Sequence, residues 1–225
     1  MDIKAYAQLS AHVYHKELKD NRMTIPNEFK KLAWKKDDPI SGFSAGTYQN
    51  TATNEIVIAF AGTNEQDGDR SKLDWRNNVE MGLGANSTID AESQFVQAIK
   101  FVLQVMEKHP NTPISFTGHS LGGGLASAMS VLFDKPAYTF DPAPFQATLI
   151  EYDFLVKAGR ILKEEQITIL SKPLAEYLAI AEEVKAVHEK HPVIHPRSGG
   201  EKAREETIEK LKEWGLKDEY SIREI

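Results

Sequence analysis

Cysteine is absent from all 225 residues of the sequence. Its absence excludes disulfide frameworks, thiolate nucleophiles and cysteine-based zinc sites, and it makes the fold independent of the redox state of its surroundings. A catalytic nucleophile in this chain must therefore be an oxygen or a nitrogen atom.

An excess of positive charge and a long apolar run are also missing. The 27 Lys and Arg residues are outnumbered by 33 Asp and Glu residues, for a net charge of −6. We expect no nucleic-acid partner, because such a partner needs a basic surface. No segment approaches the roughly 20 apolar residues of a membrane span, and no apolar signal-peptide core follows residues 1–4. These absences predict a soluble protein that is cytoplasmic or secreted without a cleavable signal peptide.

The residues that are present divide the chain into two parts. Of the 75 residues from 151 to 225, 29 are charged, against 31 of the 150 before them, which also hold 10 of the 14 glycines. The length suffices for one domain with a substantial core. We predict an α/β core over residues 1–150 and a charged helical part over residues 151–225 that caps this core or completes it.

Hydrophobic periodicity predicts the secondary structure. Apolar or alternating runs predict strands over residues 42–48, 55–60, 114–117 and 137–140, and a spacing of three to four predicts helices over residues 2–14, 95–106, 125–133, 174–187 and 201–214. The first two strands flank a turn-forming stretch and so form a hairpin. The order strand, helix, strand over residues 114–140 implies a parallel, right-handed crossover. Residues 166–170 are a candidate for one more strand.

The strongest motif is GHSLG at residues 118–122, which matches the G-x-S-x-G nucleophile elbow between a buried strand and a helix. Glycines on both sides of Ser120 permit the sharp turn that projects a serine oxygen from the sheet, and the helix N-terminus favours a developing negative charge. The alternatives are an incidental serine in a Gly-rich turn and a nucleotide-binding loop, but neither G-x-G-x-x-G nor a G-K-[ST] ending is present. We predict that Ser120 is the nucleophile of an α/β-hydrolase fold, with a mostly parallel central sheet flanked by helices and a helical C-terminal region.

Two backbone groups are candidates for the oxyanion hole. In this architecture one donor is the N–H of the residue after the serine, which is Leu121, and the other comes from a loop after an earlier central strand. Residues 60–63 (FAGT) leave such a strand, so Thr63 is the second candidate. A plain turn after a buried strand is the alternative.

The acid and the base are predicted from their positions in the chain. Asp141 directly follows the strand after the nucleophile helix, at the same sheet edge as Ser120, and a turn-capping role ahead of a proline is the alternative. Three histidines follow these residues: His188, His191 and His195. His195 lies in a proline-flanked loop and completes the order Ser, Asp, His, whereas the other two fall at the end of an amphipathic helix. We predict His195 as the base.

No metal or cofactor is predicted. The acidic loop at residues 64–69 lacks both the spacing of a calcium-binding loop and its final glutamate. We therefore expect this loop to be a solvated surface segment.

The chain resembles the fungal-type triacylglycerol lipases, known as class 3 lipases, at residues 9–14, 56–63, 74–78 and 117–124. It resembles more closely a bacterial branch of phospholipase-like domains of secreted effectors. The resemblance covers about residues 1–150, within the span of a typical domain. It implies that Ser120 is the nucleophile and that Thr63 lines the oxyanion hole.

Two departures from the family pattern affect the site. The family usually has arginine where this chain has Ala61, and its acid usually comes one strand later, where this chain has Arg160. Residues 140–145 (FDPAPF) instead resemble the acid segment of the pancreatic-type lipases, which also points to Asp141.

Together these features predict a serine esterase or lipase that hydrolyses lipid, phospholipid or other small carboxylic esters through an acyl-enzyme at Ser120. The alternative is a catalytically impaired hydrolase-like scaffold that acts as an effector or binds a protein partner through its C-terminal helices. Transient contact with a membrane surface also stays open, although the acidic face of the 174–187 helix is a poor match for anionic lipid.

Overall fold

A computed structural model describes residues 2–14, 23–35, 42–62, 93–145 and 152–190. Its helices are α1 (Ile3–His12), α3 (Gln94–Lys108), α4 (Leu121–Phe133), α6 (Tyr152–Glu164) and α7 (Lys172–Lys190). Its strands are β1 (Phe29–Lys35), β2 (Ala45–Asn50), β3 (Ile56–Phe60), β4 (Ile114–Ser120) and β5 (Ala137–Pro142). The chain divides into two compact units, Met1–Glu182 and Glu183–Ile225, and the sheet lies in the first. The boundary after residue 150 stays a prediction from composition.

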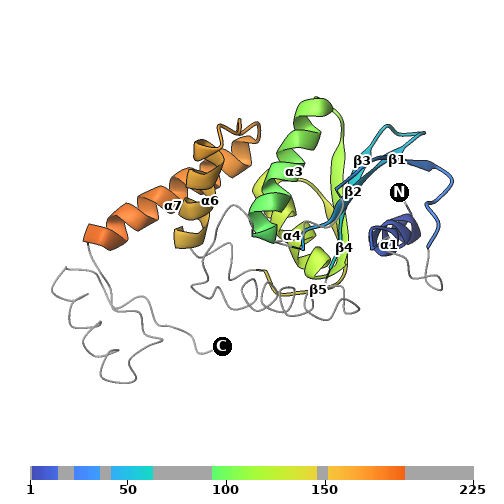
Figure 1. The fold of residues 1–225 in the computed structure, drawn as a ribbon, viewed down its shortest axis with the longest axis horizontal. Helices are drawn as coiled ribbons and strands as arrows, with labels where there is room; N and C mark the ends of the chain where they lie inside the picture. The colour runs from blue at the N-terminus through green and yellow to red at the C-terminus, as the bar shows by residue number, and fades with distance from the viewer. Residues whose placement is uncertain (1, 15–22, 36–41, 63–92, 146–151, 191–225) are drawn as a thin grey trace, which may run out of the picture. The chain divides into compact units, whose positions relative to one another are not determined.

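The described strands form one mixed sheet in the order β1-β2-β3-β4-β5 (Figure 1). β1 and β3 run antiparallel to β2, whereas β3, β4 and β5 are parallel to one another. The predicted α/β class, the hairpin and the parallel strand–helix–strand unit are confirmed, although the sheet is mixed rather than mostly parallel. The three parallel strands end at a common edge, and that edge carries the candidate site.

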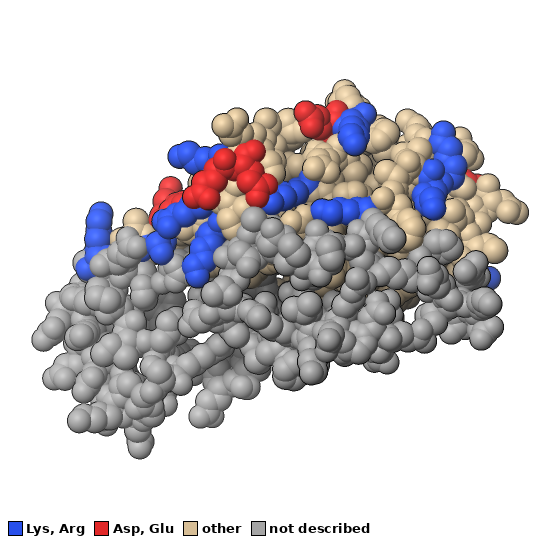
Figure 2. Space-filling model, viewed as in Figure 1, with Lys and Arg blue, Asp and Glu red and all other residues tan. Residues whose placement is uncertain are grey.

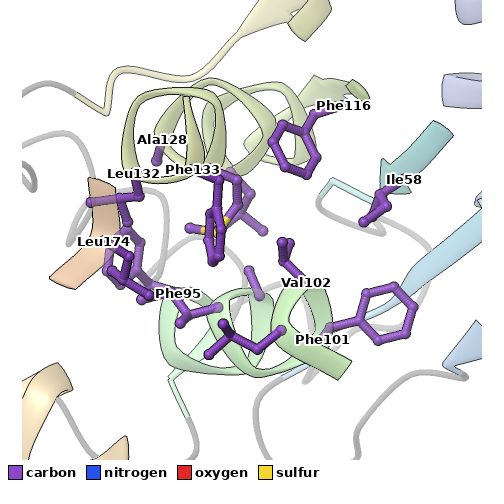
Figure 3. Close-up of a cluster of buried hydrophobic side chains, with 14 of the residues drawn as sticks. Ile58, Phe95, Phe101, Val102, Phe116, Ala128, Leu132, Phe133 and Leu174 are labelled. Atoms are coloured by element: carbon purple, nitrogen blue, oxygen red, sulfur yellow. The ribbon is translucent and has the colours of Figure 1, made fainter. Parts of the chain in front are cut away.

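Alternate side chains of β3 are buried in two different layers. Ile56, Ile58 and Phe60 pack in a cluster with side chains of α3 and α4, while Val57 and Ala59 pack in a cluster with side chains of α1. Figure 1 shows α1 on one side of the sheet and α3 and α4 on the other. Figure 3 shows the larger cluster, in which aromatic and aliphatic side chains interlock between the helices and the sheet. A strand covered on both faces has no polar side, which explains the continuous apolar sequence of β3.

The helices after residue 150 contribute to the larger cluster. Leu155 and Leu162 of α6 and Leu174 and Leu178 of α7 are buried in it. The predicted helix over residues 174–187 is confirmed as part of α7. α6 was not among the helices predicted from the sequence.

The strand predicted over residues 166–170 is wrong. Gln166 takes a left-handed φ of 56°, and the Ile167 N–H donates to the Leu162 carbonyl at 2.9 Å. This is the hydrogen-bond pattern of a Schellman cap, which ends α6 and satisfies its last carbonyl groups. The apolar residues Ile167 and Ile169 pack against the larger cluster from an irregular connection between α6 and α7.

The described surface carries both signs of charge. On the face drawn in Figure 2, Lys and Arg side chains are interspersed with Asp and Glu side chains. None of the described helices is long and apolar enough to cross a membrane.

Candidate active site

The motif at residues 118–122 forms a sharp turn from β4 into α4. β4 ends at Ser120 and α4 begins at the next residue, Leu121, so no loop connects them. Ser120 has a φ of 55° and a ψ of −127°, a conformation that residues other than glycine rarely adopt. Such backbone strain costs on the order of 1–3 kcal/mol and persists only where surrounding contacts hold it.

Ser120 occupies the N-cap position of α4 without acting as a cap. Serine is a preferred N-cap residue, but in the described first turn of α4 its hydroxyl makes no bond to a backbone N–H. The helix begins with the N–H of Leu121, whose side chain is fully buried. The free N–H groups and the helix dipole favour a negative charge beside Ser120.

The strain at Ser120 predicts that a glycine variant is more stable than an alanine variant at this position, which reverses the usual order within a helix. Ser120→Gly should have a higher free energy of unfolding than Ser120→Ala, by about 1 kcal/mol, because glycine adopts a positive φ without a steric penalty. The matched pair is Ser127→Gly and Ser127→Ala, in the interior of α4, where alanine should be the more stable by roughly 0.5–1 kcal/mol. Urea denaturation of the four variants measures both differences. If the alanine variant is the more stable one at both positions, the backbone of Ser120 is not strained.

Gly122 lets α4 pack directly against the end of β3. A Cβ atom at this position would lie 2.1 Å from the carbonyl oxygen of Phe60 and 2.8 Å from the carbonyl carbon of Ala61. At Gly118, a Cβ atom would lie 2.3 Å from the carbonyl oxygen of Gly122. A larger residue at Gly122 would push α4 away from the end of β3, and one at Gly118 would push the first turn of α4 away from β4.

The segment after β3 passes close to the backbone nitrogen of Leu121. A Cβ atom on Gly62 would lie only 3.3 Å from that nitrogen. The Ala61 N–H donates to the Ser44 carbonyl at 3.0 Å, which anchors this segment to the residue before β2. Thr63 follows directly and lies outside the described residues, so its role as a donor stays a prediction.

Asp141 lies on the strand next to Ser120 and at the same sheet edge. The register between β4 and β5 shifts at the elbow, where Ser120 pairs with Pro142 and Asp141 is the extra residue of β5. Asp141 is exposed and has a φ of 44°, and a bulge of this kind redirects a side chain. The Ala143 N–H donates to the Ser120 carbonyl at 2.9 Å, which ties the segment after Asp141 to the elbow.

The predicted base is not among the described residues. His195 and His191 both lie outside them, and His188 lies in α7. His12 is bonded through Nδ1 to the hydroxyl of Tyr48 at 2.8 Å, on the α1 side of the sheet. In the part of the chain that the structure describes, no group of three or more His, Asp or Glu side chains is arranged to hold a metal ion.

A tyrosine that the sequence analysis did not select lies beside the elbow. The Tyr14 hydroxyl donates to the carbonyl oxygen of His119 at 3.0 Å and lies 3.2 Å from Nδ1 of the same residue. The contact joins residues 105 positions apart in the chain, so no local spacing in the sequence indicates it.

Comparisons with known proteins identify relatives of this chain. A model of a phospholipase-like family, described as the Tle-like phospholipase domain, matches residues 5–168. An extracellular phospholipase A1 of Serratia liquefaciens is 34% identical over 106 residues, which cover 47% of this chain and 29% of that protein. The chain therefore spans less than a third of the length of this relative.

Solved structures of fungal and yeast lipases are also similar to the chain. A lipase from Rhizopus microsporus var. chinensis has a TM-score of 0.39 at 16% identity, over 61% of this chain and 55% of that one. A lipase from Yarrowia lipolytica has a TM-score of 0.38 at 18% identity, over 62% of this chain and 54% of that one. The chain spans about half the length of these lipases.

Proposed function

Because the chain belongs to the Tle-like phospholipase domain family, we propose that it is a serine hydrolase that cleaves carboxylic esters of lipids, foremost phospholipids, through an acyl-enzyme on Ser120. The observation that carries the proposal is the backbone of Ser120, with a φ of 55° and a ψ of −127° between β4 and α4. An ordinary strand-to-helix turn gains nothing from a strained serine that caps no helix. A nucleophile elbow requires one.

In the first half of the reaction, the Ser120 hydroxyl oxygen attacks the carbonyl carbon of the ester. His195 takes the hydroxyl proton as the new bond forms, and the Asp141 carboxylate orients the imidazole and stabilises its positive charge. The tetrahedral intermediate then collapses, the ester C–O bond breaks, and the alcohol leaves with the proton from the imidazolium. A diacyl phospholipid would release a lysophospholipid at this step.

In the second half, a water molecule replaces the alcohol. His195 removes a proton from the water as its oxygen attacks the acyl-enzyme, and the collapse of the second tetrahedral intermediate frees the fatty acid. The proton returns to the Ser120 oxygen, which restores the starting enzyme.

The N–H groups of Leu121 and Thr63 stabilise the negative oxygen in both halves of the reaction. Loss of one such donor typically costs about two to three orders of magnitude in turnover. Support comes from the close approach of Gly62, the residue before Thr63, to the Leu121 nitrogen. The bond from the Ala61 N–H to the Ser44 carbonyl restrains this segment. Class 3 lipases, which the chain resembles, usually have an arginine in place of Ala61.

A panel of acyl esters tests the proposed substrate class. The panel contains soluble esters of short, medium and long acyl chains together with vesicles of diacyl phosphatidylcholine, and titration of released fatty acid measures turnover. We expect hydrolysis of the longer esters and of the phospholipid. The absence of turnover on every ester, from a protein that elutes as a folded monomer, would contradict the proposal and favour the alternative of an impaired scaffold that binds a protein partner.

A further inference from the structure

Tyr14 follows the end of α1 and reaches the elbow from the opposite side of the sheet to α4. We propose that Tyr14 is a positioning residue that holds Ser120 in its strained conformation. This inference rests on the proposed function of Ser120 and adds a residue to the machinery of that reaction.

The Tyr14 hydroxyl lies where the end of β3 meets the elbow. It donates to the His119 carbonyl oxygen at 3.0 Å, and a Cβ atom on Gly62 would lie 2.3 Å from the same hydroxyl. That Cβ atom would also lie 2.6 Å from the His119 carbonyl oxygen. One hydroxyl group thus contacts the residue before the predicted nucleophile and the residue before the predicted oxyanion donor Thr63.

The ring of Tyr14 is anchored in the cluster on the α1 side of the sheet. This cluster has fully buried members on α1, such as Leu9, and Tyr14 packs against it together with Ala61 and Phe140. Ala61 is the residue before Gly62, and Phe140 is the residue before Asp141. The hydroxyl of Tyr14 is therefore held in place by the packing that also sets the ends of β3 and β5.

Two hydrogen bonds restrain the two peptide planes on either side of Ser120. The bond from Tyr14 fixes the plane that contains the His119 carbonyl and the Ser120 nitrogen, and the orientation of this plane sets the φ angle of Ser120. The bond from the Ala143 N–H fixes the Ser120 carbonyl, and with it the ψ angle. A strained conformation needs such restraints, because without them the backbone relaxes to a more common φ and ψ.

The two contacts of the Tyr14 hydroxyl also favour one tautomer of His119. A phenol has one proton to donate, and the Tyr14 proton goes to the His119 carbonyl oxygen. The 3.2 Å contact with Nδ1 then requires that the His119 ring donate its Nδ1–H to the Tyr14 oxygen. We therefore expect the neutral His119 side chain to take the Nδ1–H form.

Kinetics of Tyr14→Phe test the positioning role, with Tyr6→Phe as the matched control. Tyr6 also extends from α1 to β4, but its hydroxyl bonds to Ser115 and Glu55, each at 3.0 Å, near the other end of the strand. Burial raises the pKa of the Tyr6 phenol well above its usual range, so it remains a donor in this network. Loss of either hydroxyl should reduce stability, but only Tyr14 should change the chemistry at Ser120.

For Tyr14→Phe we expect kcat and the rate constant of fluorophosphonate labelling at Ser120 to fall about tenfold, with KM unchanged, as for the loss of one hydrogen bond to the reacting geometry. For Tyr6→Phe we expect kcat within about twofold of the wild type at a temperature where both variants are folded. Equal kcat values for Tyr14→Phe and the wild type would overturn the proposal, and so would an equal fall in both variants.

Nitrogen NMR of protein labelled with ¹⁵N-histidine separates this inference from the proposed function. The His119 signals of the wild type should be those of the Nδ1–H tautomer, and in Tyr14→Phe they should shift to the more common Nε2–H tautomer. If the fluorophosphonate probe does not react with Ser120 of the wild type, the proposed function fails, and the role of Tyr14 in catalysis fails with it. If the probe reacts with Ser120 of the wild type but the His119 signals are the same in the wild type and in Tyr14→Phe, the proposed role of Tyr14 is wrong and the proposed function stands.

Discussion

Replacing Ser120 with alanine is expected to lower ester turnover by about four to six orders of magnitude and to abolish covalent labelling by a fluorophosphonate probe. The substitution removes only the hydroxyl, and alanine keeps the Cβ atom, so the elbow should keep its backbone conformation. Without the hydroxyl no acyl-enzyme forms, and the remaining acceleration over water comes from the oxyanion donors and from substrate binding. Turnover is measured on the ester that the wild type hydrolyses fastest, and labelling by the mass of the intact protein and of its peptides.

The control for this variant is Ser127→Ala, on the same helix as the elbow. Ser127 lies in the interior of α4 and is half-buried, so the loss of its hydroxyl should leave both labelling and turnover within about twofold of the wild type. Ser120→Ala that is labelled as fast as the wild type would show that another residue is the nucleophile.

The elbow could be predicted because its signal is local. The residues of β4, the two glycines around Ser120 and the small residues of α4 are contiguous in the sequence, and each has a physical reason visible in the chain itself. The position of Asp141 at the same sheet edge as Ser120 could also be predicted, because consecutive parallel strands bring their carboxyl ends to one edge. The bulge that makes Asp141 the extra residue of β5 depends on the pairing with β4 and is not encoded at that position alone.

β1 was missed because its composition is typical of a surface segment. Three of its seven residues are lysines, and its burial alternates only weakly, since it is the last described strand at one edge of the sheet. The strand predicted over residues 166–170 failed for the opposite reason. Its apolar residues are part of a helix cap and the segment that follows it, and an apolar run shorter than about six residues does not distinguish these structures.

Of the three predicted catalytic residues, the base has the weakest signal in the sequence. Spacing selects Ser120 and Asp141 by their relation to strands, but a histidine after the last helix is tied to no strand. Tyr14 was missed for a related reason, because its contact with His119 depends on how α1 packs on the sheet. Neither residue is selected by a motif, because the role proposed for each depends on contacts that form only in the folded chain.

Replacing His195 with alanine should lower kcat by about four orders of magnitude and remove from the pH profile of kcat/KM the dependence on protonation of the base. The proposed mechanism needs one imidazole that accepts the Ser120 proton, and a general base that is lost cannot be replaced by water at comparable rates. His195 was selected for its place in the sequence, after Asp141 and between Pro192 and Pro196, and a base must be held in place to transfer a proton efficiently. The pH profile of kcat/KM and the rescue of turnover by added imidazole measure this role.

The controls are His188→Ala and His191→Ala, which remove the two other histidines that follow Asp141 in the chain. Neither should lower kcat by more than about twofold, because in the proposed mechanism neither side chain contacts a reacting atom or positions a group that does. A large loss of turnover in one of these two variants and none in His195→Ala would move the base to that position. Full turnover in all three variants would show that a group other than these histidines takes the proton of Ser120. The proposed triad would then be wrong at its base, and Ser120→Ala would still test its nucleophile.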